Sequence, residues 1–421
     1  MDHFTEVTHQ GILGRLGNSI KGIVVGGGLL IASFPILFVN EGCAVKDFRR
    51  LTEARKAAVE VPSDSVSPEN EGRLLVVSGE ATTDEEVEDP DFDVRAKALR
   101  LEREVVMYQW DEDVTTSTEK KVGGGETTTK EYSYEKKWSE GLKRSSDFKR
   151  PDGHRNPTEM PFESAKFQAK EVLLGAFQLP QDLVSKISGD EPLLLTDADL
   201  QRMPPAILKK GIGHPLLAEA PEDASSAAGV SLVDGALYLG QDPDSPVIGD
   251  VRVAFETVLP STVTVRSEQR NQSFAAWSSS TGAQVHEIRM GTLSAKEMNA
   301  KAVSAAKIRT WLVRLGGFFA MGLGLSIILG PLAVVLDVVP FLGSMVRGAS
   351  ALVAFVLAAL MSLVVIAIAW FTYRPLLSIP LLVVAAVLGW WLSRRGQQQV
   401  SPTASGAAGS AGGGVLPPMT F

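Results

Sequence analysis

The sequence is short of the residues from which most catalytic and metal sites are built. It has one cysteine, Cys43, and five scattered histidines, so it forms no intramolecular disulfide and shows no zinc-binding spacing. No Gly-x-Ser-x-Gly elbow occurs, and the glycines at 123–125 lack the Gly-Lys-Ser/Thr ending of a phosphate loop. The net charge of −8 comes without the clustered basic face that nucleic-acid binding needs. We therefore expect no catalytic residue, no cofactor, no metal and no nucleic-acid partner.

Charge is also nearly absent from four long apolar runs. Each approaches the ~20 residues that a helix needs to cross a hydrocarbon core about 30 Å thick, and a helix satisfies its backbone polar groups internally. The sequence therefore predicts four transmembrane helices, at residues 23–39, 311–336, 348–371 and 376–392. Residues 1–22 precede the first of them. The Gly-, Ala- and Ser-rich residues 396–421 follow the last as a tail that is expected to be disordered.

The expected fold class is α+β, with a β-rich soluble body inserted between one N-terminal and three C-terminal transmembrane helices. The body occupies residues 40–310. Asn40-Glu41-Gly42 follows the first apolar run where a signal peptide would have a small-x-small site, which favours an uncleaved anchor. Four crossings would leave both termini on the side opposite the body. Lysines and arginines beside the spans favour a cytoplasmic body, but this rule is weak for long domains.

Within the body, β-favouring residues on both sides of the 123–125 glycines predict a long β-hairpin. Trp110, Tyr132, Tyr134 and Trp138 fit the alternation of its strands, so we expect them to be core or interface aromatics rather than a ligand cage. Helical spacing predicts helices at residues 163–177 and 181–187. The β-rich parts at about 70–190 and 230–293 are faintly alike, and internal duplication and chance similarity stay equally open.

Two features concern the helices. Ser294 and Glu297 form a capping box that begins a helix expected to run unbroken from the body through the second span. Small residues also recur at four-residue spacing, which lets membrane helices approach closely. These rows serve either packing within one bundle or contacts between subunits, and the two alternatives stay equal here. The rows are Gly316, Ala320 and Gly324 in the second span and Ser350, Ala354 and Ala358 in the third.

Short motifs give the chain a resemblance to the transmembrane protein forty-three family, also called LUMA. Their residues are Tyr108, Trp110, Tyr132, Tyr134, Trp138, Asn156, Pro157, Asp250, Arg252, Trp311, Arg314, Arg374 and Pro375. The resemblance implies an integral membrane protein of the endoplasmic reticulum and inner nuclear membrane in animals, or of the bacterial cell membrane. It also implies a self-associating scaffold that organises other membrane proteins, with its large body on the extracytoplasmic side.

Three functional hypotheses follow. The first is a non-enzymatic scaffold whose partners are the lipid bilayer, further copies of the chain and other membrane proteins. The second is a channel or transporter component, for which Ser326, Ser350 and Ser362 are the available mid-span polar groups. The third is a membrane-anchored hydrolase whose catalytic residues come together only in space. The architecture, the missing catalytic motifs and the resemblance favour the first hypothesis.

Overall fold

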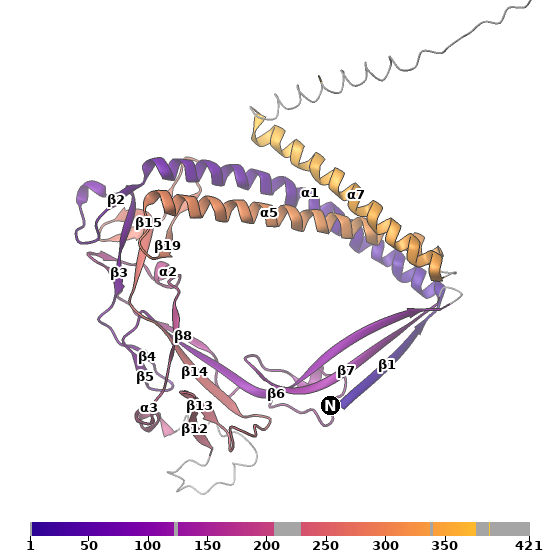
Figure 1. Ribbon diagram of the computed structural model, residues 1–421, viewed down its shortest axis with the longest axis horizontal. Helices are drawn as coiled ribbons and strands as arrows, with labels where there is room; N and C mark the ends of the chain where they lie inside the picture. The colour runs from indigo at the N-terminus through magenta and orange to yellow at the C-terminus, as the bar shows by residue number, and fades with distance from the viewer. Residues whose placement is uncertain (1, 122–124, 206–228, 337–339, 376–386, 388–421) are drawn as a thin grey trace, which may run out of the picture.

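The computed structural model describes residues 2–121, 125–205, 229–336, 340–375 and 387 (Figure 1). A β-rich body stands at one end of a layer of long helices, and a long hairpin extends from the body beneath them (Figure 1). The fold class is α+β as expected, with one N-terminal and two long C-terminal apolar helices flanking the body. The predicted fourth span, apart from residue 387, and the predicted tail lie outside the described residues.

Two sheets form most of the body. The eight-stranded sheet contains β1 (Asp2–Gln10), β6 (Arg100–Lys120), β7 (Glu126–Ser139), β8 (Ala165–Gln168), β11 (Asp190–Leu193), β12 (Val230–Val233), β13 (Ala236–Leu239) and β14 (Val251–Val258). Its main strand order is β1-β7-β6-β14-β13-β12, with β8 also paired to β6 and β11 to β14. All of these pairings are antiparallel.

The seven-stranded sheet has the order β19-β15-β16-β10-β9-β3-β2, with a further pairing of β15 to β3. Its strands are β2 (Val59–Val61), β3 (Leu74–Thr82), β9 (Leu173–Leu174), β10 (Phe177–Gln178), β15 (Ser261–Arg270), β16 (Ser273–Ala275) and β19 (Glu287–Met290). Smaller elements are the pairs β4 (Val87–Asp89) with β5 (Val94–Ala96) and β17 (Trp277–Ser278) with β18 (Gln284–Val285), the turns η1 (Pro68–Asn70) and η2 (Ser145–Asp147), and the helices α2 (Gln181–Val184) and α3 (Asp197–Arg202).

Both sheets contribute to one hydrophobic core. Alternate residues of β14 are buried, as the period of a strand with one face on a core requires. Leu101 and Val253 from the larger sheet are fully buried in the same cluster as Val77 and Val265 from the smaller one. The core therefore joins the two sheets into one body.

The predicted hairpin is confirmed, and a predicted helix beside it is wrong. β6 and β7 pair from Met107↔Ser139 to Lys120↔Glu126. Residues 163–177, by contrast, form β8, β9 and the start of β10, because Ala165–Gln168 completes hydrogen bonding along Arg100–Arg103. Gly175, at φ +61°, makes the turn between β9 and β10, where a side chain would meet the Ser63 carbonyl. The short helix α2 is all that forms of the helix expected at 181–187.

The long helices are α1 (Ile12–Ala57), α5 (Ala295–Ile328) and α7 (Pro340–Tyr373), and the short α6 (Gly330–Leu336) lies between α5 and α7. Among the described residues, three helices are long and apolar enough to cross a membrane: Leu13–Ala57, Ala295–Leu332 and Gly348–Tyr373. The capping box at Ser294 is present, and α5 runs unbroken from the body into its apolar part. It ends at Ile328 instead of continuing to residue 336, since Pro331 cannot donate the hydrogen bond that a continuing helix needs.

The N-terminal strand was not expected from the sequence. β1 pairs antiparallel with β7 along its whole length, from Asp2↔Tyr134 to Gln10↔Glu126. Just beyond it, the Arg15 Nε lies 2.9 Å from the Glu126 carboxylate. β1 therefore lies against the β6–β7 hairpin, next to the N-terminal end of α1. The expected placement of both termini on the side opposite the body stays a prediction.

This strand pairing predicts a cross-link. Thr5 and Glu131 are register partners, so cysteines at these positions in a Cys43→Ser background should be joined by a short bismaleimide in intact membranes. The matched control pairs the Thr5 cysteine with one at the exposed Glu69 of η1, which lies beside the smaller sheet. Cross-linking of Thr5 to Glu131 that occurred only after detergent extraction would show that β1 leaves the hairpin when a bilayer is present.

The suggested internal duplication stays a prediction. The first β-rich part supplies β3 to the smaller sheet and β6 and β7 to the larger one. The second part supplies β15 to the smaller sheet and β13 and β14 to the larger one. Each part thus contributes to both sheets, while the faintly similar segments themselves, in β3 and β13, lie in different sheets.

Candidate functional site at the junction of helices and body

The motif residues gather in two places. One group lies along one face of the β6–β7 hairpin, and the other lies where α1, α5 and α7 meet at the ends of their apolar runs. No group of three or more metal-ligating side chains occurs among the residues that the structure describes.

On the hairpin, strand register places the motif aromatics on a common face. Tyr108 is opposite Trp138, and Trp110 is opposite Lys136, one alternate position from Tyr134. The Tyr134 ring stacks on the His154 ring at 3.9 Å between centroids, and Trp110 meets the same His154 edge-on at 4.8 Å. These aromatics are therefore in contact with protein groups, as expected of core or interface residues.

Polar groups fix these rings. The Tyr134 hydroxyl donates to Glu112 at 2.6 Å, and burial together with this bond raises the pKa of Tyr134 to about 12. Tyr134 consequently stays protonated and acts as a donor. At the other end of the face, the Arg252 guanidinium lies 4.2 Å from the Trp138 ring centroid. Asp250 accepts a 2.6 Å hydrogen bond from the Tyr238 hydroxyl.

Asn156 fastens the loop after the hairpin to the hairpin itself. Its side-chain oxygen accepts from the Trp110 backbone N–H at 2.7 Å, and its amide nitrogen donates to the Trp110 and Lys143 carbonyls, each at 2.9 Å. The half-buried Pro157 follows it. An asparagine suits this position, since its side-chain amide offers the carbonyl acceptor and the two N–H donors that these three hydrogen bonds use.

Paired carboxylates make the stability of this region dependent on pH. Burial alone would raise the pKa of Asp111, but hydrogen bonds from Lys137 and Lys143 outweigh burial and hold this pKa below its ordinary value. A depressed folded-state pKa stabilises the fold above the unfolded pKa of about 3.9 and loses that contribution as the pH falls through the folded value. Asp111→Asn should therefore destabilise the protein by roughly 1 kcal/mol at neutral pH.

The same difference should shrink below about pH 4, where the wild-type carboxylate becomes protonated too. Thermal melts of the two proteins over an acid pH series measure this. A difference that stayed constant at acid pH would contradict the assignment of the stabilisation to the ionised Asp111.

At the helix junction, Glu41 of α1 is fully buried and holds three helices together. It accepts hydrogen bonds from the Arg314 Nε and a terminal nitrogen of the same guanidinium at 2.7 and 2.8 Å. The Trp370 indole N–H of α7 donates to it at 2.8 Å. The Arg314 guanidinium also lies 4.9 Å from the Trp311 ring centroid. We call Glu41, Arg314 and Trp370 the junction clasp.

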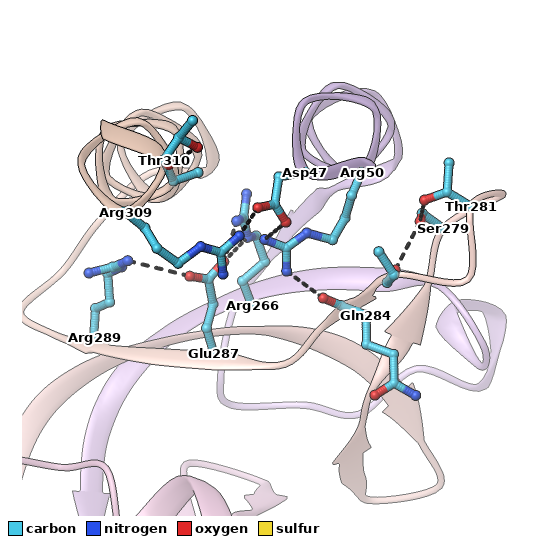
Figure 2. A network of polar contacts seen from close by, with 12 residues as sticks. Asp47, Arg50, Arg266, Ser279, Thr281, Gln284, Glu287, Arg289, Arg309 and Thr310 are labelled. Atoms are coloured by element: carbon cyan, nitrogen blue, oxygen red, sulfur yellow. Dashed lines mark hydrogen bonds and ion pairs between the residues drawn. The ribbon is translucent and has the colours of Figure 1, made fainter. Parts of the chain in front are cut away.

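A second ionic layer joins α1 and α5 to the body (Figure 2). Asp47 pairs with Arg309 of α5 and with Arg50, the latter at 3.3 Å. Arg50 also donates to the Gln284 carbonyl of the body at 2.6 Å. Beneath it, the fully buried Arg266 pairs with Glu287, which also forms an ion pair with Arg289 at 3.5 Å (Figure 2). Neither layer is predictable from the sequence, because the partners lie far apart in the chain and share no local pattern.

The small-residue rows lie mainly inside the bundle. A side chain at Gly324 would meet the Gly26 carbonyl oxygen of α1 at 2.7 Å, so these two glycines bring α1 and α5 into backbone contact. Ala354 and Ala358 on α7 are fully buried, whereas Ala320 and Ser350 are half-buried. Gly316 faces open space. Packing within one chain is thus the use that the structure shows for Gly324, Ala354 and Ala358.

Within the described ranges, a Ser-His-Asp group in the body is the spatial candidate for the hydrolase hypothesis, and its geometry is unfavourable. Ser267 Oγ lies 2.5 Å from His286 Nδ1, and His286 Nε2 lies 3.1 Å from Asp182. However, Ser267 is fully buried and donates to the Ala275 carbonyl. The adjacent pocket of about 480 Å³ is lined by His286 and Asp182 but not by the serine. A nucleophile must reach its substrate, so this group fits a structural role.

The channel hypothesis gains no support from the mid-span hydroxyls. Ser362 Oγ donates to the Ala359 carbonyl of its own helix at 2.9 Å. The Ser326 hydroxyl is buried and makes no hydrogen bond within the part of the chain that the structure describes. Neither arrangement is that of a polar group facing a conduction path.

A β-rich body fastened by buried ion pairs to membrane-length apolar helices defines an integral membrane protein with one large extramembrane domain. The chain belongs to the Transmembrane protein 43 family, whose model matches residues 107–375 and so contains every motif from Tyr108 to Pro375. It is 31% identical over 383 residues to Transmembrane protein 43 of Rattus norvegicus, covering 88% of this chain and 89% of that protein.

Further relatives show the same extent of similarity. Identity is 29% over 380 residues to Transmembrane protein 43 of Homo sapiens, covering 88% of each chain. It is 27% over 378 residues to the Drosophila melanogaster homologue, covering 87% of this chain and 92% of the relative. No solved structure matches the chain.

Proposed function

We propose that this protein is a non-enzymatic scaffold that self-associates in a membrane and organises other membrane proteins around its body. The observation that carries the proposal is the stiff connection between helices and body. α1 and α5 pass without a break from their apolar runs into the body. The junction clasp and the ion pair of Asp47 with Arg309 hold the two helices together. A platform fixed in this way presents its surfaces at a constant height and orientation above the lipid.

Self-association is supported by an open strand edge. β1 ends the eight-stranded sheet, and its outer edge pairs with no other strand among the described residues. Such an edge is a template for pairing with another chain, and symmetric assemblies of identical copies are the usual outcome. Val7, 51% exposed, lies on this strand.

The test is the mass of the purified protein in several detergents and in native nanodiscs, measured by mass photometry. We expect a defined homo-oligomer, weakened by Val7→Lys, because charge on an edge strand opposes further pairing. The matched control is Val114→Lys, at an equally exposed valine of β6. Monomers alone in every condition would contradict self-association, and equal effects of both variants would contradict the use of the β1 edge.

We further propose that the body is extracytoplasmic, in the bacterial cell membrane or, in a eukaryotic host, in the endoplasmic reticulum and inner nuclear membrane. The family relationship supports this orientation, whereas the lysines and arginines beside the spans favour the opposite one. A cysteine at the exposed Ser146 in a Cys43→Ser background should react with a membrane-impermeant maleimide in intact cells or sealed vesicles of known orientation. Labelling only after lysis would place the body in the cytoplasm.

A further inference from the structure

A groove of about 320 Å³ lies between α1 and α5, beside the end of α7. It is lined by the apolar residues Ala44, Phe48 and Val303 and by the cationic residues Lys307, Arg314 and Arg374, and Asp47 also lies on its lining. We propose that this groove binds the phosphate of an anionic phospholipid, with Lys307 and Arg374 as its ligands. This proposal does not depend on self-association.

Two cations around the groove, Lys307 and Arg374, have no carboxylate paired with them in the described ranges, and the Arg374 guanidinium lies 6.0 Å from the Trp370 ring centroid. Glu41 is occupied by Arg314, and Asp47 is occupied by Arg309 and Arg50. The side chains of Lys307 and Arg374 make no ion pair or hydrogen bond with any other residue of the described ranges. In a chain of net charge −8, these two side chains form a local excess of positive charge that faces one cavity.

The chemistry of the groove fits a phosphate. A guanidinium can offer two parallel N–H donors to phosphate oxygens, and an ammonium adds a compact charge. The apolar wall keeps water away from this contact, and an ion pair is stronger where the local dielectric is low. The small side chains of Ala44 and Ala306 leave the room that the phosphate needs.

The position of the groove favours a lipid over a soluble anion. Trp311 lines the groove and is 60% exposed, and Leu312 and Leu315 continue the exposed apolar surface of α5 away from it. Tryptophan beside basic residues at the end of an apolar run is typical of the level of lipid headgroups. Basic pockets between membrane helices at that level recognise anionic headgroups. A phospholipid whose phosphate is held in the groove would therefore place its acyl chains along α5.

The test uses the full-length protein in detergent, with phosphatidylglycerol, phosphatidylcholine or soluble glycerol phosphate added, and native mass spectrometry to count bound lipid. We expect binding of phosphatidylglycerol to be stronger than that of phosphatidylcholine, and glycerol phosphate not to compete. Lys307→Gln/Arg374→Gln should weaken phosphatidylglycerol binding at least about tenfold, since it removes two charge-assisted contacts. The melting temperature should change little, because the variant breaks no ion pair or hydrogen bond of the described ranges and loses only the long contact of Arg374 with the Trp370 ring, 6.0 Å from the ring centroid.

Two matched variants make the result decisive. Lys296→Gln/Lys301→Gln removes the same charge from exposed positions of α5 farther into the body and should leave binding unchanged. Lys307→Arg/Arg374→Lys keeps both charges and should retain most of the binding. An equal loss in the Lys296/Lys301 variant would show a bulk charge effect and overturn the site. Competition by glycerol phosphate at the same concentration would overturn the assignment to a lipid, as would equal binding of phosphatidylcholine.

Discussion

Replacing Glu41 by leucine is expected to destabilise the helix bundle by about 3–5 kcal/mol, the cost of removing one partner from a buried ion pair. Arg314 would keep its charge in a site where its Nε and a terminal nitrogen have no other acceptor in the described structure. The Trp370 indole N–H would lose its acceptor as well. Because α1, α5 and α7 all meet at this carboxylate, the effect should reach the whole bundle.

The measurement is thermal unfolding of the purified protein in a fixed detergent. Glu41→Leu/Arg314→Met should recover much of the loss, since replacing both members of a buried pair by apolar side chains is often nearly neutral. Glu53→Leu is the matched control on the same helix, where the carboxylate accepts hydrogen bonds from Ser280 at the surface, and it should lower the melting temperature far less than Glu41→Leu does. A Glu41→Leu protein as stable as the Glu53→Leu protein would contradict the role assigned to the clasp.

The features that the sequence predicted correctly are those set by local chemistry. Alternation on both sides of a glycine turn is enough to predict β6 and β7, because a hairpin needs only neighbouring residues to agree. The capping box at Ser294 and the absence of proline from the residues that follow are likewise local signals, and α5 follows them. The helix ends where its local chemistry changes, at Gly330 and Pro331.

The features that the sequence did not predict depend on residues far apart in the chain. β1 becomes a strand because β7, more than a hundred residues later, completes its hydrogen bonding. The sequence of residues 165–168 predicts a helix, but these residues pair with β6 as a strand. Strand pairing therefore overrides their intrinsic preference for a helix. The sequence motif around Arg314 is recognisable, whereas the sequence around its partner Glu41 indicates only that a signal-peptide cleavage site is missing.

The role of the small residues in α5 also depends on a partner that lies far away in the chain. A row of small residues predicts close approach of a helix but does not identify the partner helix. In the structure the partner of Gly324 is α1 of the same chain: an added Cβ would lie 2.7 Å from the Gly26 carbonyl oxygen and 2.9 Å from the Leu30 nitrogen. Both are backbone atoms, so no side-chain rotation can relieve the contact. At Gly316, two turns earlier, nothing lies within 4 Å of an added Cβ.

Gly324→Leu is therefore expected to destabilise the bundle by about 3 kcal/mol, at the upper end of typical overpacking costs. Gly316→Leu should stabilise α5 by up to about 1 kcal/mol, because glycine is a poor helix former and no clash opposes the change. Thermal unfolding in detergent compares the two variants, and mass photometry follows their assembly. If Gly316→Leu separated an oligomer into monomers while leaving the melting temperature unchanged, this part of the row would face a neighbouring subunit. Tolerance of leucine at Gly324 would contradict the backbone contact between α1 and α5.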